Sequence, residues 1–385
     1  MIYLDNGATS FPKPGPVRRA VQEALLICAN PGRGGYEAAL QAAETVFTCR
    51  ERAATLFDCR PEQVVFTLNA THALNMAIHT LVQPGDRVVI SGFEHNAVTR
   101  PLHGLGADIL VAGRRLFDWE DTLSQWEKAL KSKPKAAIFT HVSNVFGYIL
   151  PAEALAALCR RYQVPFIIDA AQSAGMLPLS LRKLGADFIA MPGHKGLLGP
   201  QGTGILLCGR TPDPILRGGT GSESKNQEMP DFLPDRGEAG TLNVPGIAGL
   251  SAGLALVTET GVERIFRREA GEAAFCARGL RNLGYRVFTG PNQSGTVSFL
   301  PNQDCETAAS RLAELGIACR AGLHCAPLAH ESAGTLATGT VRLSFGHSCS
   351  RQESREFLRR MGGNFPGGSC KKTVNCYCHP EGDTV

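Results

Sequence analysis

Side chains able to take part in catalysis follow five apolar, strand-like runs of this sequence. The runs span residues 64–67, 87–91, 136–140, 165–169 and 187–191. The side chains at or after their ends are Thr71 and His72, His95, Asn144, Asp169 and Gln172, and His194 and Lys195. In open α/β sheets, ligands bind beyond the carboxyl ends of the strands. We therefore expect these side chains to face one common site.

Two charged residues of this set are costly to place next to buried strands. Lys195 stands in the loop Pro192-Gly193-His194-Lys195-Gly196, where desolvation lowers the pKa of an amine and favours Schiff-base chemistry. Asp169 ends an apolar run, and a buried carboxylate is unfavourable unless a cation meets it. For either residue taken alone, a solvated lysine or a capping aspartate is the more ordinary interpretation.

The remaining members complete a recognisable set of chemical requirements. The segment 69–72 opens a predicted helix, whose free N–H groups and the Thr71 hydroxyl form an anion site or, more ordinarily, an N-cap. His95 and Asn144, each taken alone, are ordinary polar residues. Together, an anion site, a flat ring, a buried carboxylate and a reactive amine are what pyridoxal 5′-phosphate (PLP) requires.

The elements that must position these residues alternate along the chain. A sixth predicted strand covers 204–208, and predicted helices cover 17–29, 70–81, 119–131 and 152–162. This alternation predicts an α/β fold with a largely parallel sheet. After a helical stretch from 243 to 283, strands at 285–288, 296–300, 317–320 and 341–345 and helices at 306–315 and 352–361 predict a smaller α+β domain.

Composition and charge argue against several classes of protein. Of 385 residues, 43% are hydrophobic and 19% charged, which excludes global disorder. The net charge of +4 argues against nucleic acid as a partner, and no apolar run is long enough to predict a membrane-spanning helix. The N-terminus does not resemble a secretory signal, so a cytoplasmic protein is expected. The 13 cysteines are then expected to be reduced thiols, ligands or catalysts.

Several motifs resemble those of a known family. They are Tyr3-Leu-Asp-Asn-Gly-Ala-Thr9, Asp169-Ala-Ala-Gln172, Gly193-His194-Lys195, Glu238-Ala-Gly-Thr241 and Arg320-Ala-Gly-Leu-His-Cys325. The chain resembles the class V aminotransferase branch of the fold-type-I PLP enzymes, and within it the cysteine desulfurases of the SufS-like type. The resemblance implies a large domain, 12–263, with a mostly parallel seven-stranded sheet. It also implies a small α+β domain, 1–11 and 264–361, and an additional C-terminal tail, 362–385.

The resemblance implies a role for each matching residue. Lys195 is the Schiff-base lysine, Asp169 the partner of the pyridinium nitrogen, Gln172 the donor to the ring hydroxyl, and His95 a stacked ring and proton carrier. Asn144 faces the cofactor and substrate, Arg342 clamps the substrate α-carboxylate, and Arg320 is a further substrate-binding residue. Thr71, His72 through its backbone, and His194 bind the phosphate, as does Thr241 of a neighbouring subunit, which implies a homodimer with shared active sites.

Cys325 decides the implied reaction. It stands where these desulfurases keep their nucleophile, and nearby His324 and Arg320 are expected to favour its thiolate. The implied activity is conversion of L-cysteine to L-alanine, with a persulfide on Cys325 that passes to a sulfur-acceptor protein. Pro192 departs from the family, which has a serine there that helps to hold the phosphate.

Other functions remain open at this level. The same scaffold serves selenocysteine lyases, cystine or cysteine C–S lyases and class V aminotransferases. A non-enzymatic sulfur carrier or scaffold is disfavoured by the presence of both Lys195 and Asp169. In the tail, Cys370, Cys376, Cys378 and His379 are open to three interpretations, namely an ordinary terminus without a role, a sulfur relay or a metal site.

Overall fold

The computed structural model describes residues 1–32 and 34–364. The tail residues Cys370, Cys376, Cys378 and His379 lie outside this part of the chain, so their role stays a prediction. Within the described ranges, no helix combines the length and the apolar character needed to cross a bilayer.

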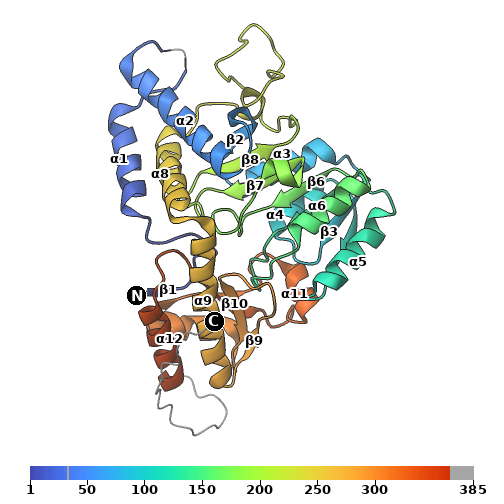
Figure 1. The fold of residues 1–385 in the computed structure, drawn as a ribbon, viewed down its shortest axis with the longest axis vertical. Helices are drawn as coiled ribbons and strands as arrows, with labels where there is room; N and C mark the ends of the chain where they lie inside the picture. Colours follow the sequence, from blue (N-terminus) through green and yellow to red (C-terminus); the bar gives the residue numbers. More distant parts are fainter. Residues whose placement is uncertain (33, 365–385) are drawn as a thin grey trace, which may run out of the picture.

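A seven-stranded sheet forms the centre of the larger part of the molecule (Figure 1). Its strands are β2 (Val64–Thr67), β3 (Arg87–Ser91), β4 (Asp108–Ala112), β5 (Ala136–Thr140), β6 (Phe166–Asp169), β7 (Phe188–Pro192) and β8 (Gly204–Cys208). They lie in the order β2-β8-β7-β6-β5-β3-β4, and β8 runs antiparallel to both of its neighbours. The predicted mainly parallel sheet is confirmed.

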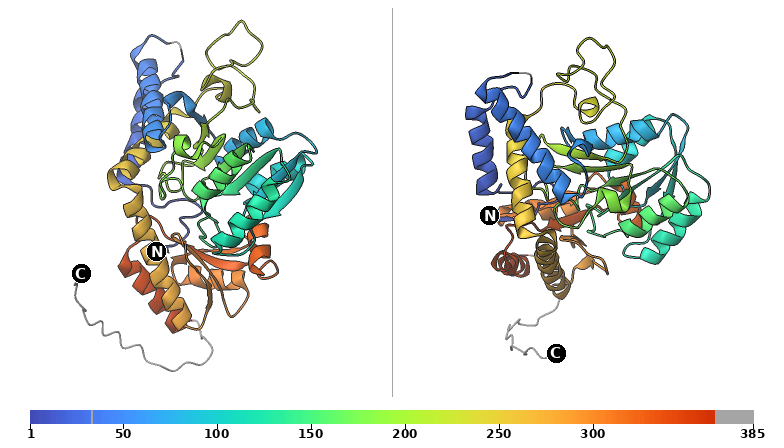
Figure 2. Two further views of the ribbon diagram at one scale, coloured as in Figure 1. Left: turned by 45° about the vertical axis from the view of Figure 1, so that its right-hand side comes forward. Right: turned by 45° about the horizontal axis from the view of Figure 1, so that its top comes forward.

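Helices cover both faces of this sheet. They are α1 (Gly15–Ile27), α2 (Glu37–Leu56), α3 (Ala70–Leu81), α4 (Asn96–Gly104), α5 (Trp119–Leu130), α6 (Ala152–Arg161), α7 (Leu181–Leu184) and α8 (Val244–Thr260). Side chains of α3 and α4 pack on one face, while those of α2, α5, α6 and α8 pack on the other. Because apolar layers lie on both faces, the strands read as continuous apolar runs in the sequence. In Figures 1 and 2, α1, α2 and α8 stand side by side at one end of the molecule.

A second sheet with its own hydrophobic core lies below the seven-stranded sheet in the view of Figure 1. Its strands are β9 (Arg286–Phe288), β10 (Thr296–Leu300), β12 (Arg320–Gly322) and β13 (Thr340–Ser344), in the antiparallel order β12-β13-β10-β9. Four helices belong to this half of the chain, namely α9 (Val262–Asn282), α10 (Cys305–Glu314), α11 (Pro327–Ala333) and α12 (Arg351–Asn364). The N-terminal strand β1 (Ile2–Tyr3) joins here by parallel pairing with β11 (Ile317–Ala318). Figure 1 accordingly shows the N-terminus beside α12.

Three of the differences between the structure and the sequence-based elements concern the following strands and helix. Strand β4, a partly exposed edge strand, was not predicted, although its residues 109–112 form a continuous apolar run. The single strand predicted at 317–320 is two short strands, β11 and β12, which pair with different partners. Helix α12 continues to Asn364, three residues beyond the predicted end.

Candidate active site

The loop after β7 carries Lys195 into a pocket at the carboxyl end of the sheet. The residues at this pocket that were singled out from the sequence are Thr71, His95, Asn144, Asp169, Gln172, His194 and Lys195. The loop is held close to the chain that follows β6, because a Cβ at Gly196 would clash with the Ala174 carbonyl oxygen. The expectation of one common site is therefore met for these residues.

The electrostatics of the pocket centre on Lys195 and Asp169. Burial lowers the pKa of Lys195 to about 8, with Arg342 and Arg320 acting in the same direction and Asp169 opposing them. Burial raises the pKa of Asp169, against the effects of its hydrogen bond from the Ala171 N–H (2.8 Å) and of the Lys195 charge. A lysine with a pKa near 8 is a far better nucleophile at neutral pH than a solvated one.

His95 is fixed as a neutral ring at the start of α4. Its Nδ1 accepts a hydrogen bond from the Ala97 N–H (3.0 Å), so the neutral ring carries its proton on Nε2. Burial, together with the charges of Lys195, Arg342 and Arg100, lowers the pKa of His95 to about 4. The ring is therefore uncharged at neutral pH and able to accept or pass on a proton.

Glu94, which the sequence did not single out, anchors the loop that carries His95. The carboxyl group is fully buried, and Oε1 accepts hydrogen bonds from the Ser91 hydroxyl and from the Thr140 N–H (2.8 Å). Glu94 thereby joins the ends of β3 and β5. The signal in the sequence is a carboxylate three residues after an apolar run.

Glu94 gives a testable pH dependence. Burial raises its pKa to about 8 from 4.5, so the folded protein retains a proton that the unfolded chain releases across this window. The free energy of unfolding then falls as the pH rises. Glu94→Gln mimics the protonated carboxyl and cannot titrate. From pH 5 to 7.5, its free energy of unfolding, measured with urea, should therefore fall by about 1–3 kcal/mol less than that of the wild-type protein. Parallel profiles for the two proteins would show that Glu94 does not titrate in this range.

The loop that contains Cys325 is attached to the pocket through its main chain. The Asn144 side-chain NH₂ donates to the His324 carbonyl oxygen (2.8 Å), and the Asn96 N–H donates to the Cys325 carbonyl oxygen (2.7 Å). His324 and Cys325 both have left-handed backbone conformations, with φ of 50° and 55°. Such strain in two successive non-glycine residues is typical of functional loops. The Cys325 side chain itself is exposed.

The prediction that His324 favours the thiolate form of Cys325 is wrong. Its ring is buried, and Nε2 lies 3.1 Å from the Thr340 carbonyl oxygen and 3.2 Å from the Thr340 hydroxyl. Burial, with the charges of Arg342 and Arg320, lowers the pKa of His324 to about 2, so the ring carries no positive charge. Arg320 does interact electrostatically with Cys325.

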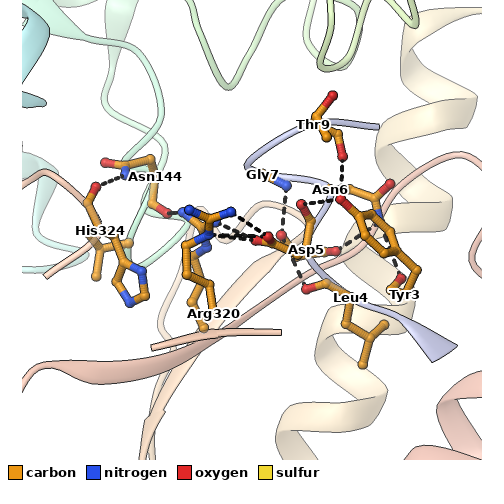
Figure 3. A network of polar contacts seen from close by, with 12 residues as sticks. Tyr3, Leu4, Asp5, Asn6, Gly7, Thr9, Asn144, Arg320 and His324 are labelled. Carbon is orange, nitrogen blue, oxygen red and sulfur yellow. Dashed lines mark hydrogen bonds and ion pairs between the residues drawn. The ribbon is translucent and has the colours of Figure 1, made fainter. Parts of the chain in front are cut away.

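Arg342 and Arg320 lie at the boundary between the two sheets, where both contact Asp5 (Figure 3). The Arg342 Nη1 group also donates to the Asn144 carbonyl oxygen (3.0 Å), which places Arg342 against the residue that holds the Cys325 loop. Asp5 belongs to the matched motif 3–9, but no role was predicted for it. The pattern that marks Asp5 in the sequence is a carboxylate directly after a strand-like Tyr-Leu pair, and this pattern by itself is only a weak indication of a functional role.

Comparison with known proteins identifies the family. The sequence profile of the family described as Aminotransferase class-V matches residues 2–357. The chain belongs to this family. The predicted resemblance is thereby confirmed over nearly all of the described chain.

Several relatives of this chain are named as cysteine desulfurases. Probable cysteine desulfurases of Methanothermobacter thermautotrophicus and Pyrococcus abyssi are each 32% identical to it, covering 91% and 93% of the chain and 92% of each relative. The apo structure of a cysteine desulfurase from Thermococcus onnurineus NA1 superposes with a TM-score of 0.87 at 32% identity and covers 94% of both chains. CsdA of Escherichia coli, also a cysteine desulfurase, gives 0.82 at 25% identity and covers 93% of both. The fold-type-I architecture is confirmed.

The pocket of this family member fits PLP. It offers a partly desolvated amine on Lys195, a buried carboxylate on Asp169 and the N-terminus of α3 with Thr71. The Nδ1 atom of His194 is buried in the same pocket without a hydrogen-bond partner. A phosphate group bound there would supply the acceptor that this ring lacks when it is protonated on Nδ1.

Two residues expected at the phosphate lie apart from this pocket. His72 and Thr241 line a neighbouring cavity, and Thr241 is exposed. The His72 backbone N–H, expected to bind phosphate, donates to the N-capping Asn69 side chain (2.9 Å). Pro192 ends strand β7 and lines the Lys195 pocket without a hydroxyl.

Proposed function

We propose that this protein is a PLP-dependent cysteine desulfurase that converts L-cysteine to L-alanine and receives the sulfur on Cys325. The observation that carries the proposal is the attachment of the Cys325 loop. Two successive carbonyl groups, of His324 and Cys325, accept hydrogen bonds from Asn144 and Asn96, which flank the Lys195 pocket. A cysteine is thus held beside a pocket built for PLP, as sulfur transfer requires. The proposal includes the two-domain division 12–263 and 1–11 with 264–361.

Different residues would bind the cofactor, bind the substrate and transfer protons. PLP bound through Lys195 supplies an electrophilic carbon and an electron sink for bond cleavage at the substrate. Asp169 would hold the proton on the ring nitrogen, Gln172 would bind the ring hydroxyl, and Thr71 and His194 would hold the phosphate. Lys195, once released by the substrate amine, would take the proton from Cα, with neutral His95 as a further acceptor. Arg342 would bind the α-carboxylate, for which a guanidinium is suited.

Sulfur transfer is then a displacement at the substrate sulfur. The Cys325 thiolate attacks this atom, so that a sulfur–sulfur bond forms and the bond between substrate sulfur and Cβ breaks. The electron pair of the broken bond stays with Cβ, which takes up a proton to become the methyl group, and Lys195 would return a proton to Cα to complete alanine. Atoms and electrons balance without an external oxidant. The exposed Cys325 side chain suits delivery of the persulfide to a sulfur-acceptor protein.

Incubation with L-cysteine tests this proposal. PLP-loaded protein should form one alanine for each sulfur recovered as persulfide or, with a thiol reductant present, as sulfide. Pyruvate in place of alanine would indicate a C–S lyase, and amino-group transfer to a keto acid would indicate an aminotransferase. A parallel incubation with L-selenocysteine compares the two substrates by their kcat/KM values and tests the alternative of a selenocysteine lyase.

A homodimer and a cytoplasmic location are further parts of the proposal. Helices α1 and α2 and the segment between them carry exposed large apolar side chains, namely Leu25, Leu26, Ile27, Tyr36, Leu40 and Phe47. Such a surface is characteristic of an interface. Thr241, which lies apart from the Lys195 pocket of its own chain, would reach the phosphate of the partner. Ten free cysteines among the described residues are typical of a reducing compartment.

Mixing two inactive variants tests the shared site. Lys195→Ala and Thr241→Ala homodimers should each have low activity. A heterodimer of the two should regain one site that has both residues intact and approach half of the wild-type activity per dimer. Activity that stays at the level of the parents, after heterodimers are confirmed by differential tags, would contradict the donation of Thr241 across the interface.

A further inference from the structure

The N-terminal segment forms part of the small sheet next to Arg342. Ser344 lies two residues beyond Arg342 on β13, and its N–H donates to the Leu4 carbonyl oxygen (2.7 Å). In return, the Asn6 N–H donates to the Ser344 carbonyl oxygen (3.2 Å), and the Gly7 N–H to its hydroxyl (2.7 Å). The backbone on both sides of Asp5 is therefore fixed to the strand that carries Arg342.

The Asp5 carboxylate bridges two arginines from this fixed position, and Figure 3 shows Arg320 beside it. Its Oδ1 accepts a hydrogen bond from Arg342 Nη2 (2.8 Å), and its Oδ2 accepts from Arg320 Nη2 (2.9 Å) and Nε (3.2 Å). The Asp5 side chain is only 12% exposed, while those of Arg342 and Arg320 are 3% and 52% exposed. One carboxylate thus holds a deeply buried guanidinium and a second one nearer to solvent.

Arg342 retains an unused donor in this arrangement. Its Nη2 donates to Asp5 and its Nη1 to the Asn144 carbonyl oxygen, while the Nε atom is buried without a hydrogen-bond partner. An unpaired buried donor is unfavourable, and an anionic ligand would satisfy it. The two arginines and Asp5 together carry a net charge of +1, which one ligand carboxylate would neutralise.

We propose that Asp5 is a positioning residue that holds Arg342 and Arg320 in place to receive the α-carboxylate of the substrate. The inference rests on the proposed function for the identity of that substrate. Without Asp5, Arg342 would be a buried charge lacking its counter-ion, and two guanidinium groups would repel each other across the vacated position. Because the Asp5 backbone is hydrogen-bonded to β13, its carboxylate stays in place when the ligand binds.

Binding of ligands with and without a carboxylate tests this proposal. The PLP-loaded protein and Asp5→Asn are each titrated with L-alanine, which carries the α-carboxylate, and with ethylamine, which lacks it, while the cofactor absorbance is recorded. We expect Asp5→Asn to weaken L-alanine binding at least tenfold and to change ethylamine binding less than twofold. With L-cysteine, KM should rise at least tenfold, and kcat should fall by a smaller factor.

The matched control is a second buried carboxylate that binds an arginine. In the small domain, Glu272 accepts hydrogen bonds from Arg351 (3.0 Å) and from the Ser354 hydroxyl (2.7 Å). Glu272→Gln should leave the affinity for L-alanine within twofold of the wild type even where it lowers the melting temperature. If Asp5→Asn does not fold, Asp5→Glu supplies the same comparison.

Two results would overturn the role of Asp5. One is L-alanine affinity within twofold of the wild type, and the other is tighter binding, which would mean that Asp5 competes with the substrate. Because the L-alanine titration needs no turnover, it is independent of desulfuration. A failure of the wild-type protein to form alanine from L-cysteine would instead contradict the proposed function.

Discussion

Replacing Cys325 with alanine should abolish persulfide formation from L-cysteine while the cofactor site stays intact. The side chain is exposed, and the loop is held by the main-chain carbonyl groups of residues 324 and 325, which Cys325→Ala retains. The left-handed conformation at position 325 disfavours alanine as it does cysteine, so little change in stability is expected. Since the variant lacks the nucleophile, we expect sulfur transfer to fall by a factor of about 10³ or more.

The measurement is mass-spectrometric detection of the persulfide together with alanine release, in protein whose PLP absorbance matches the wild type. Cys59→Ala is the control, because Cys59 is a half-buried free thiol that follows helix α2 and does not line the Lys195 pocket. This control should retain full activity. Desulfuration by Cys325→Ala at the wild-type rate would remove Cys325 from the mechanism.

Replacing Lys195 with alanine should remove both covalent attachment of PLP and turnover. Lys195 lies beside Asp169 in the pocket, and its pKa of about 8 makes part of the amine available in the nucleophilic form at neutral pH. Loss of the group that binds PLP covalently and moves the substrate proton should lower kcat by a factor of about 10⁴ or more. Borohydride reduction followed by peptide mapping should place PLP on Lys195 in the wild-type protein and on no residue in Lys195→Ala.

Lys13 provides a matched control for this experiment. Burial also lowers its pKa to about 8, and its amine donates hydrogen bonds to the Ser10 hydroxyl (2.7 Å) and the His194 carbonyl oxygen (2.8 Å). It is therefore a second reactive amine close to the pocket. Lys13→Ala should still be labelled on Lys195. A label on Lys13 in the wild-type protein would show that the assignment of the Schiff-base lysine is wrong.

Much of the site was predictable because it follows from local patterns. Asp169 ends a four-residue buried strand and Lys195 stands three residues after another, so an apolar run followed by a charge marks each of them. Asn69 caps α3 as expected for a helix start, and Thr71 lies in its first turn. By the same rule β4 was predictable, because its residues 109–112 form an apolar run like those of the other strands, but it was not predicted.

Other features of the site leave no local pattern in the sequence, so they could not be predicted from it. The effect of His324 on the Cys325 thiolate was predicted wrongly, because a histidine next to a cysteine in sequence need not face it. The ring packs toward Thr340 and lies 5.8 Å from the ring of His330. The anchoring of the His95 loop by Glu94 depends on Thr140, which lies 46 positions further along the chain.

The sequence by itself determined the family, the mainly parallel sheet and the residues that meet at its carboxyl edge. The physical reason is that parallel strands all present their carboxyl ends at one edge, so residues that follow buried strands converge whatever lies between them. Only the tertiary structure decided which charges meet at the boundary of the two sheets. Asp5 and Arg342 are 337 positions apart and come together because β1 pairs with β11 and the segment after β1 forms a bridge to Ser344 of β13. The free energy of that contact depends on burial and on the geometry of both guanidinium groups, neither of which a local pattern encodes.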